Sequence, residues 1–236
     1  AYYEMYGYEG LKAFNYTINY ALGRGMIVIA DCKRNDIGST AGCYATAYLG
    51  STRINEKTMR AFPADMLTVN GYLGTDGIAP FVEECKACNK GAFVLVKTSN
   101  PSSGEIQDLK LESGEKVYER MGALVSEWGK DLIGHFGYSD IGAVVGATYP
   151  EQGAELRKKL PHTFFLIPGY GAQGGSAEGI KGCFDERGLG GIVNNSRGII
   201  TAYRKPQYSG MTYWEAARAA CIDMREDLRK ALGKMG

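Results

Sequence analysis

Six short apolar runs, rich in β-branched residues, constrain the fold of this chain more than any other feature. The hydrophobic residues within each run are continuous rather than alternating, which is typical of strands that are buried on both faces. We therefore predict six strands, at Met26–Ala30, Met66–Val69, Ala92–Val96, Ile141–Gly146, Thr163–Ile167 and Gly191–Val193.

Amphipathic stretches lie between the predicted strands. We predict helices at Gly42–Tyr48, Ile78–Asn89, Tyr118–Ile133, Gln152–Lys159 and, last in the chain, Tyr213–Leu232. This alternation of strands and helices indicates a parallel sheet covered by helices. An open doubly wound sheet and a closed (β/α) barrel both satisfy the pattern.

The segments that follow the strands favour the barrel. Polar, charged or glycine-rich clusters come directly after nearly every predicted strand, and this is where a (β/α) barrel builds its active site. The sequence contains no internal repeat, low-complexity tract or linker. We therefore expect residues 1–236 to form a single domain.

Composition excludes several classes of protein. The chain has 236 residues, of which 44% are hydrophobic and 22% charged, so it is neither disordered nor collagen-like. No apolar run approaches the roughly 18 residues of a membrane span. The net charge is +1 without a basic block, which argues against nucleic acid as a partner. The 33 glycines, about twice the usual share, indicate tight loops or loops whose backbone approaches a ligand.

The six cysteines are scattered, and the N-terminus has no signal-peptide pattern. Together these features predict reduced thiols in a cytoplasmic protein. Cys85 and Cys88 form a C-x-x-C pattern, which is compatible with a redox pair or with half of a zinc site. Because no second pair and neither histidine lies nearby, we interpret both as structural thiols.

The cluster after the first predicted strand has the sequence DCKRNDIGST. Asp31 and Lys33 are two residues apart, so regular strand alternation would point both side chains to one face, within a few ångströms of each other. In a barrel mouth of low dielectric the carboxylate would keep the lysine charged, and Asp36 could add a second carboxylate. Such an array suits a reaction that builds negative charge beside a proton donor. A salt-bridged strand end remains an equally simple explanation.

A glycine-rich loop, PGYGAQGG, follows the fifth predicted strand and matches G-x-G-x-x-G at Gly169, Gly171 and Gly174. The dinucleotide-binding pattern also needs a helix at its third glycine and an acidic residue about 20 positions later. Neither requirement is met. A loop whose backbone amides and Gln173 hold a phosphate fits better.

Two further clusters follow strands. The segment NNSRG places Arg197 after the last strand, where phosphate-binding barrels hold their phosphate. The guanidinium group offers a fork of donors for that anion. The segment TSNPSS offers Ser99 and its neighbours to a base or a sugar, although such a sequence also forms an ordinary turn.

In this order, the four clusters resemble the orotidine 5′-monophosphate decarboxylases, specifically their bacterial subgroup with the motif D-x-K-R-x-D-I-G-S-T-A. The resemblance extends from Ala1 to the last helix. It implies a TIM (β/α)8 barrel that removes CO₂ from orotidylate without metal or cofactor and yields UMP, the last step of de novo pyrimidine synthesis. It also implies a homodimer with shared active sites.

The resemblance also implies roles for individual residues. Lys33 resembles the proton donor to the ring carbanion, and Asp31 resembles the carboxylate that crowds the substrate carboxylate and orients the lysine. Asp36 and Thr40 resemble the pair that reaches into the neighbouring subunit's site. Ser99 resembles the contact with the pyrimidine edge, and Gln173 and Arg197 resemble the phosphate-binding residues.

The chain departs from the family in its strand count, six rather than eight. AYYEMYGYEG resembles the segment just after the second strand, so we expect the first two strands, with a ribose-binding Asp and another active-site Lys, to precede Ala1. A true fragment would neither fold well nor turn over. Two alternative functions remain: a Mg²⁺-dependent sugar-phosphate decarboxylase or aldolase of the same barrel group, and a non-catalytic protein that binds a nucleotide phosphate.

Overall fold

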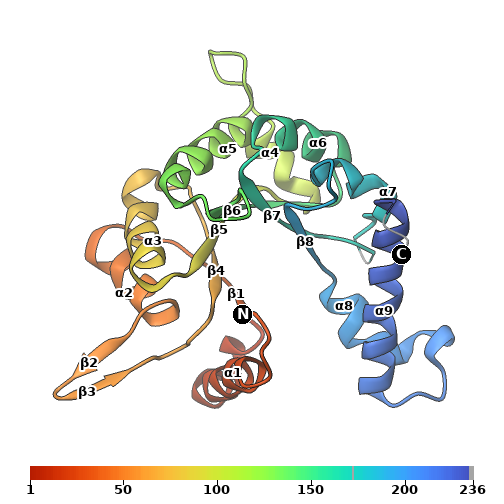
Figure 1. The fold of residues 1–236 in the computed structure, drawn as a ribbon, viewed down its shortest axis with the longest axis horizontal. Coiled ribbons are helices and arrows are strands. Elements are labelled where there is room, and N and C mark those ends of the chain that lie inside the picture. The colour runs from red at the N-terminus through yellow and green to blue at the C-terminus, as the bar shows by residue number, and fades with distance from the viewer. Residues whose placement is uncertain (172, 234–236) are drawn as a thin grey trace. The chain divides into compact units, whose positions relative to one another are not determined.

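The computed structural model describes residues 1–171 and 173–233 and contains a parallel sheet with helices in the connections (Figure 1). The sheet order is β1-β4-β5-β6-β7-β8, and its strands are β1 (Ile29–Arg34), β4 (Met66–Val69), β5 (Gly91–Lys97), β6 (Ser139–Val145), β7 (Thr163–Pro168) and β8 (Gly191–Asn194). The helices are α1 (Gly7–Leu22), α2 (Gly38–Tyr48), α3 (Thr75–Cys88), α4 (Gly104–Gln107), α5 (Val117–Trp128), α6 (Pro150–Lys159), α7 (Ala177–Ile180), α8 (Ser196–Ile200) and α9 (Tyr213–Ala231).

The chain divides into two compact units. Unit 1 comprises Ala1–Leu95 and Leu124–Ala143, and unit 2 comprises Val96–Ala123 and Val144–Gly236. The single domain expected over residues 1–236 stays a prediction.

In unit 1, β4 pairs in parallel with β1 on one side and with β5 on the other. Helices α2 and α3 pack against each other, and Ala41 and Ala45 of α2 are fully buried. Ile78 and Phe81 of α3 are buried as well, as the apolar spacing of the predicted helix requires.

The first strand differs from its prediction. It begins at Ile29 rather than at Met26 and continues through the polar motif to Arg34. Met26 and Ile27 are 60% and 78% exposed, and the exposure of β1 side chains varies along the strand, so β1 is not buried on both faces. The apolar run was misplaced because hydrophobicity alone cannot separate a strand from the segment that leads into it.

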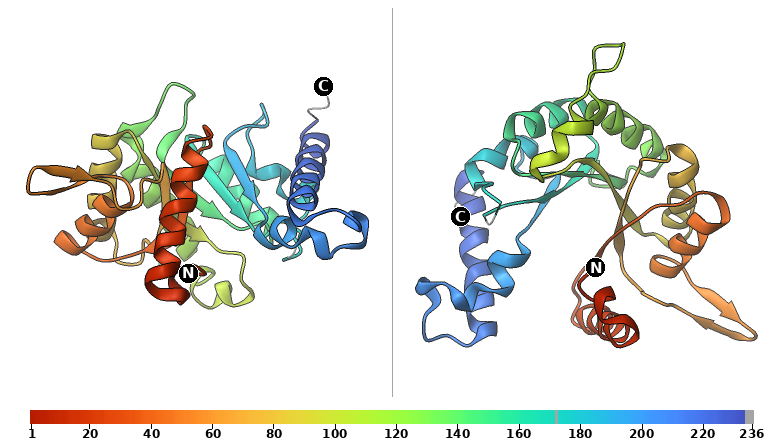
Figure 2. Two further views of the ribbon diagram at one scale, coloured as in Figure 1. Left: turned by 90° about the horizontal axis from the view of Figure 1, so that it is seen from below. Right: turned by 180° about the vertical axis from the view of Figure 1, so that it is seen from behind.

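Two elements of unit 1 have no counterpart in the sequence prediction. Helix α1 carries three exposed tyrosines, Tyr8, Tyr16 and Tyr20, and of its residues only Gly10 and Ile18 are buried. The antiparallel hairpin formed by β2 (Thr52–Ile54) and β3 (Lys57–Met59) is exposed throughout and extends away from α2 (Figures 1 and 2). Neither element contains a continuous, buried apolar run, which is the feature that the strand prediction uses.

In unit 2, β7 and β8 pair in parallel from Phe165 and Gly191 onward. Phe165 and Ile167 are fully buried, whereas Ile192 of β8 is 45% exposed, so β8 does not have the two buried faces that were predicted. In the described sheet β8 is the last strand and has a neighbour on one side only.

Helix α9 closes unit 2. A capping box between Thr212 and Glu215 fixes its first turn, and Ala216 and Ala220 are buried in a small cluster with Tyr208. The helix runs beside α8, which follows β8 directly (Figure 1). Within residues 1–171 and 173–233, no helix combines the length and apolar character needed to cross a membrane.

The buried guanidinium of Arg157, on α6, joins the segments around β7 and β8. Arg157 is only 7% exposed and donates hydrogen bonds to five carbonyl oxygens. Those of Leu160, Thr163, Cys183 and Gly190 lie at 2.8 to 3.1 Å, and that of Pro161 lies at 3.5 Å.

We predict that Arg157→Met lowers the free energy of unfolding by on the order of 3 kcal/mol, because it leaves buried carbonyls without donors. Urea denaturation measures the change. Arg218→Met, at an exposed position of α9, is the control and should stay within about 0.5 kcal/mol of the unaltered chain. Equal stability of the two variants would contradict this assignment.

Candidate active site

The β1–β4 pairing contains an irregularity at the DCKRND motif. Ala30 pairs with Leu67, and the next pairing joins Arg34 to Val69. Three residues of β1, Asp31 to Lys33, therefore stand opposite the single residue Thr68. Within this bulge Lys33 has a φ of +47°, in the left-handed region that side chains other than glycine seldom adopt.

Asp31 and Lys33 form the ion pair that the sequence predicts. Lys33 Nζ lies 2.6 Å from Asp31 Oδ1. The predicted reason was regular alternation along a strand, and that reason is wrong, because the bulge interrupts the strand here. The low-dielectric surroundings are not observed either, since the lysine and aspartate side chains are 51% and 62% exposed. So exposed a pair contributes about 0–1 kcal/mol to stability.

Thr68 is the residue that sequence reasoning missed. Its side chain is 1% exposed, and its Oγ1 accepts the backbone N–H of Lys33 at 2.9 Å and donates to Asp31 Oδ1, also at 2.9 Å. The available signal was a hydroxyl inside the otherwise apolar run MLTV, close to its carboxyl end. Buried hydroxyls need a hydrogen-bond partner, and here the partners are the two predicted catalytic residues.

Asp36 and Thr40 lie further along the same segment. The carboxylate of Asp36 accepts the backbone N–H of Ile37 at 2.8 Å, and Thr40 is exposed in the first turn of α2. The motif residue Arg34 binds Glu4, and it donates to the Tyr48 hydroxyl at 3.0 Å. Burial acts to lower the pKa of Arg34, but the hydrogen bonds with Tyr48 and Glu4 outweigh it and raise that pKa. Arg34 thereby ties the N-terminal segment to β1.

In unit 2 the structure brings two predicted residues into contact. Ser99 Oγ donates to Gln173 Oε1 at 2.6 Å, across 74 positions of sequence. Two glycines make room for the serine. A Cβ at Gly146 would lie 2.7 Å from the Ser99 nitrogen, and one at Gly169 would lie 3.0 Å from Ser99 Cβ. Thr148 Oγ1 further holds the serine by donating to its carbonyl oxygen at 3.1 Å.

The glycine-rich loop adopts conformations that require glycine. Gly169, Gly171 and Gly174 have φ values of +99°, +71° and +99°, while Ala172 lies outside the described residues. Helix α7 starts only at Ala177, after the N-cap Ser176, and spans four residues. The dinucleotide-binding pattern needs a helix that begins at its third glycine, Gly174, and in this described stretch the helix begins later and is short.

The NNSRG segment lies next to this loop. A Cβ at Gly171 would lie 3.2 Å from the side-chain nitrogen of Asn195, whose oxygen caps α8 by accepting the N–H of Gly198 at 3.1 Å. Arg197 is exposed in the first turn of α8. The three residues predicted to bind substrate in unit 2 thus belong to adjoining loops, and Arg197 presents its guanidinium to solvent.

The segment after β5 is held by a buried lysine. Lys97 is fully buried, lies 2.9 Å from Asp108 Oδ2 and sits over the ring of Tyr149 at 4.3 Å. The hydrogen bond with Lys97 lowers the pKa of Asp108. Gln107 adds a second tie, because its amide accepts from the Thr98 backbone and donates to the Thr98 hydroxyl. These contacts fix the backbone on either side of Ser99.

The cysteines behave as structural thiols. Burial raises the pKa of Cys85 to about 12 and that of Cys183 to about 11, so neither is a nucleophile at neutral pH. Cys88 donates to Glu84 on the same helix. Among the described residues, no group of three or more His, Cys, Asp or Glu side chains is placed to hold a metal ion.

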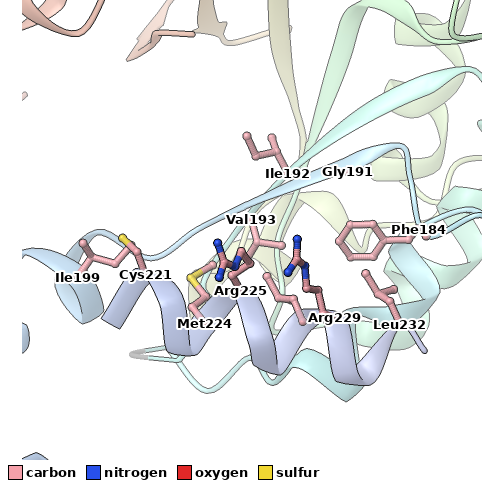
Figure 3. A pocket seen from close by; sticks show the side chains of 12 residues that line it. Phe184, Gly191, Ile192, Val193, Ile199, Cys221, Met224, Arg225, Arg229 and Leu232 are labelled. Atoms are coloured by element: carbon pink, nitrogen blue, oxygen red, sulfur yellow. The ribbon is translucent and has the colours of Figure 1, made fainter. Parts of the chain in front are cut away.

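A separate open pocket of about 510 Å³ lies between β8 and α9 in unit 2 (Figure 3). Its walls are mostly hydrocarbon, with Ile192 and Val193 on the strand and the guanidinium groups of Arg225 and Arg229 on the helix. None of the residues predicted from the sequence to act on substrate lines it.

Comparison with known proteins decides the family. The family model described as "Orotidine 5'-phosphate decarboxylase / HUMPS family" matches residues 2–212. The chain belongs to this family. It is 46% identical over 232 residues to the orotidine 5'-phosphate decarboxylase of Caldicellulosiruptor bescii, and the aligned region covers 98% of this chain and 75% of that relative. It is also 46% identical over 233 residues to the corresponding protein of Rhodopirellula baltica, covering 97% of this chain and 76% of the relative.

A solved structure supports the same assignment. The OMP decarboxylase of Leishmania donovani superposes with a TM-score of 0.71 at 29% identity, over 96% of this chain and 78% of that one. This likeness to a family member confirms the fold class predicted from the sequence, an α/β barrel of the TIM type.

The ion pair between Lys97 and Asp108 predicts that the stability of the protein depends on pH. The folded-state pKa of Asp108 lies below its ordinary value of 3.8, so the stabilisation by the carboxylate is complete above that pH and is lost as the pH falls through the lowered pKa. Asp108→Asn should therefore reduce the free energy of unfolding at neutral pH, and the difference from the unaltered chain should shrink in acid.

Urea denaturation at neutral pH and at successively lower pH measures this difference. Glu112→Gln, an exposed substitution nearby, is the control and should change stability little at any pH. A difference for Asp108→Asn that stays constant with pH would show that the carboxylate's charge is not what matters.

Proposed function

We propose that this chain decarboxylates orotidine 5'-monophosphate to UMP, the last step of de novo pyrimidine biosynthesis, without a metal or an organic cofactor. The observation that carries the proposal is 46% identity with named orotidine 5'-phosphate decarboxylases over nearly the whole chain. The Asp31–Lys33 pair supplies chemistry that fits such a reaction, because it places an ammonium group and a carboxylate side by side.

In the proposed reaction the bond between the pyrimidine ring and its carboxylate breaks, and the electron pair stays on the ring carbon. CO₂ leaves, and a proton from Lys33 Nζ forms the new C–H bond. Asp31 positions the lysine, and its negative charge crowds the substrate carboxylate. Stabilisation of this kind acts on the transition state, where charge develops on the ring.

Ser99, Gln173 and Arg197 are proposed to bind the substrate. The Ser99–Gln173 contact and the adjoining glycine loop support this role, because hydroxyl, amide and backbone N–H groups suit a pyrimidine edge and a phosphate. The exposed guanidinium of Arg197 supplies a charged fork for the phosphate. Phosphate binding would then provide energy to order the loop and to exclude water.

We predict that Lys33→Ala reduces kcat by at least about 10³-fold while UMP still binds, because the lost proton donor acts only in the transition state. The ultraviolet change of orotidylate, recorded in a chelator, measures turnover, and calorimetry measures UMP binding. Lys12→Ala, an exposed lysine of α1, is the matched control and should retain the unaltered kcat. Turnover that requires Mg²⁺ would favour the sugar-phosphate enzymes instead.

We also propose that the working enzyme is a homodimer in the cytoplasm, with Asp36 and Thr40 of each subunit completing the partner's site. The exposed position of Thr40 at the start of α2 supports a contact beyond this chain. The six free cysteines are compatible with a reducing compartment.

Shared sites predict complementation between inactive variants. Lys33→Ala and Asp36→Ala should each be nearly inactive alone. After the two are mixed in equal amounts and allowed to exchange subunits, about a quarter of the unaltered activity should return, since half of the dimers are hybrids and each hybrid has one intact site. No recovery, with subunit exchange shown by mass spectrometry, would contradict the shared site.

A further inference from the structure

We propose that Thr68 is a positioning residue, whose buried hydroxyl fixes Asp31 and Lys33 in the geometry that proton transfer needs. The inference rests on the proposed function, because it concerns the same proton donor. It adds a residue that touches neither the reacting atoms nor the phosphate-binding loops and that acts only through the two residues it holds.

The first step of the argument is the gap in the β1–β4 ladder. Between the pairings Ala30–Leu67 and Arg34–Val69, β1 has two more residues than β4. The backbone groups of a bulge cannot all find partners in the ladder, and a polar group left without one is costly. The Thr68 hydroxyl accepts the Lys33 N–H at 2.9 Å and so replaces the missing backbone acceptor.

The second step is the conformation of Lys33. A φ of +47° is unfavourable for a residue that carries a side chain, and it persists only where the surroundings hold it. This dihedral sets the direction in which the lysine side chain leaves the backbone. The hydrogen bond from the Lys33 N–H to Thr68 therefore helps to hold the direction from which the side chain extends to Asp31.

The third step is the hydrogen bond that the Thr68 hydroxyl donates. It donates to Asp31 Oδ1 at 2.9 Å, and this carboxylate oxygen also accepts a hydrogen bond from Lys33 Nζ at 2.6 Å. Thr68 is thus bonded to the backbone of the proton donor and to the carboxylate that orients it. A hydroxyl can do both, because it is one donor and also an acceptor.

The fourth step compares how firmly these side chains are held. Asp31 and Lys33 are more than half exposed, and pairs of that kind do not by themselves hold long side chains in one geometry. Thr68 is 1% exposed on a strand that is paired on both sides, and its branched Cβ restricts rotation. It is the rigid member of the group.

The kinetic test uses Thr68→Val, which keeps the shape and removes both hydrogen bonds, and Thr68→Ser, which keeps the hydroxyl. We expect kcat for orotidylate to fall by about 10²-fold in Thr68→Val, since misplacement by about an ångström has that effect. KM should stay within about twofold, and Thr68→Ser should restore most of kcat. The control is Thr163→Val, which changes a buried threonine at the start of β7 and should keep the unaltered kcat.

No turnover by the unaltered chain would overturn the proposed function and this inference with it. Turnover that Thr68→Val leaves at the unaltered kcat would overturn the inference alone. Thr68→Ser still decides the matter if Thr68→Val does not fold, since a Val-like loss of kcat in the serine variant would contradict the role of the hydroxyl.

A geometric measurement complements the kinetics. Hydrogen exchange of the Lys33 amide, followed by NMR, should be slow in the unaltered chain and in Thr68→Ser and faster in Thr68→Val. Equal exchange rates in the unaltered chain and Thr68→Val would show that the hydroxyl does not hold this backbone, and would overturn the inference.

Discussion

The bulge between β1 and β4 sets three residues against one, and the candidate acid–base pair exists because a threonine hydroxyl fills the resulting gap. The bulge turns Lys33 out of the regular strand and into a left-handed conformation. Its ammonium group then reaches Asp31 while both side chains remain open to solvent. An exposed pair adds little to stability, so we attribute the strained backbone at this point to function.

In unit 2, glycines determine how closely Ser99 approaches the neighbouring segments. Gly146 and Gly169 let Ser99 approach two other segments of backbone, and Gly171 lets the following loop approach Asn195. The Lys97–Asp108 pair then fixes the end of β5, two residues before Ser99. Glycines and the ion pair of the buried Lys97 together hold the Ser99–Gln173 contact.

Much of this could be predicted from the sequence. Continuous apolar runs located β4 at its observed bounds, β5, β6, β7 and β8 to within two residues, and β1 to within four. A strand buried on both faces leaves a strong pattern, and β1, which is not buried in this way, was located least well. The motif also placed Asp31 beside Lys33 correctly. The rest depends on register: a bulge, a positive φ and the partner of Thr68 arise from how two strands align, and no single segment encodes that alignment. Helix α1 and the exposed hairpin escaped prediction because they bury too little apolar surface to leave a pattern.

The most direct test of the whole account is to mix the full-length protein with orotidine 5'-monophosphate labelled with ¹³C in its carboxylate, in the presence of a chelator. The account predicts that labelled CO₂ and UMP appear in equal amounts over many turnovers. Release of no labelled CO₂, or release only after Mg²⁺ is restored, would contradict it.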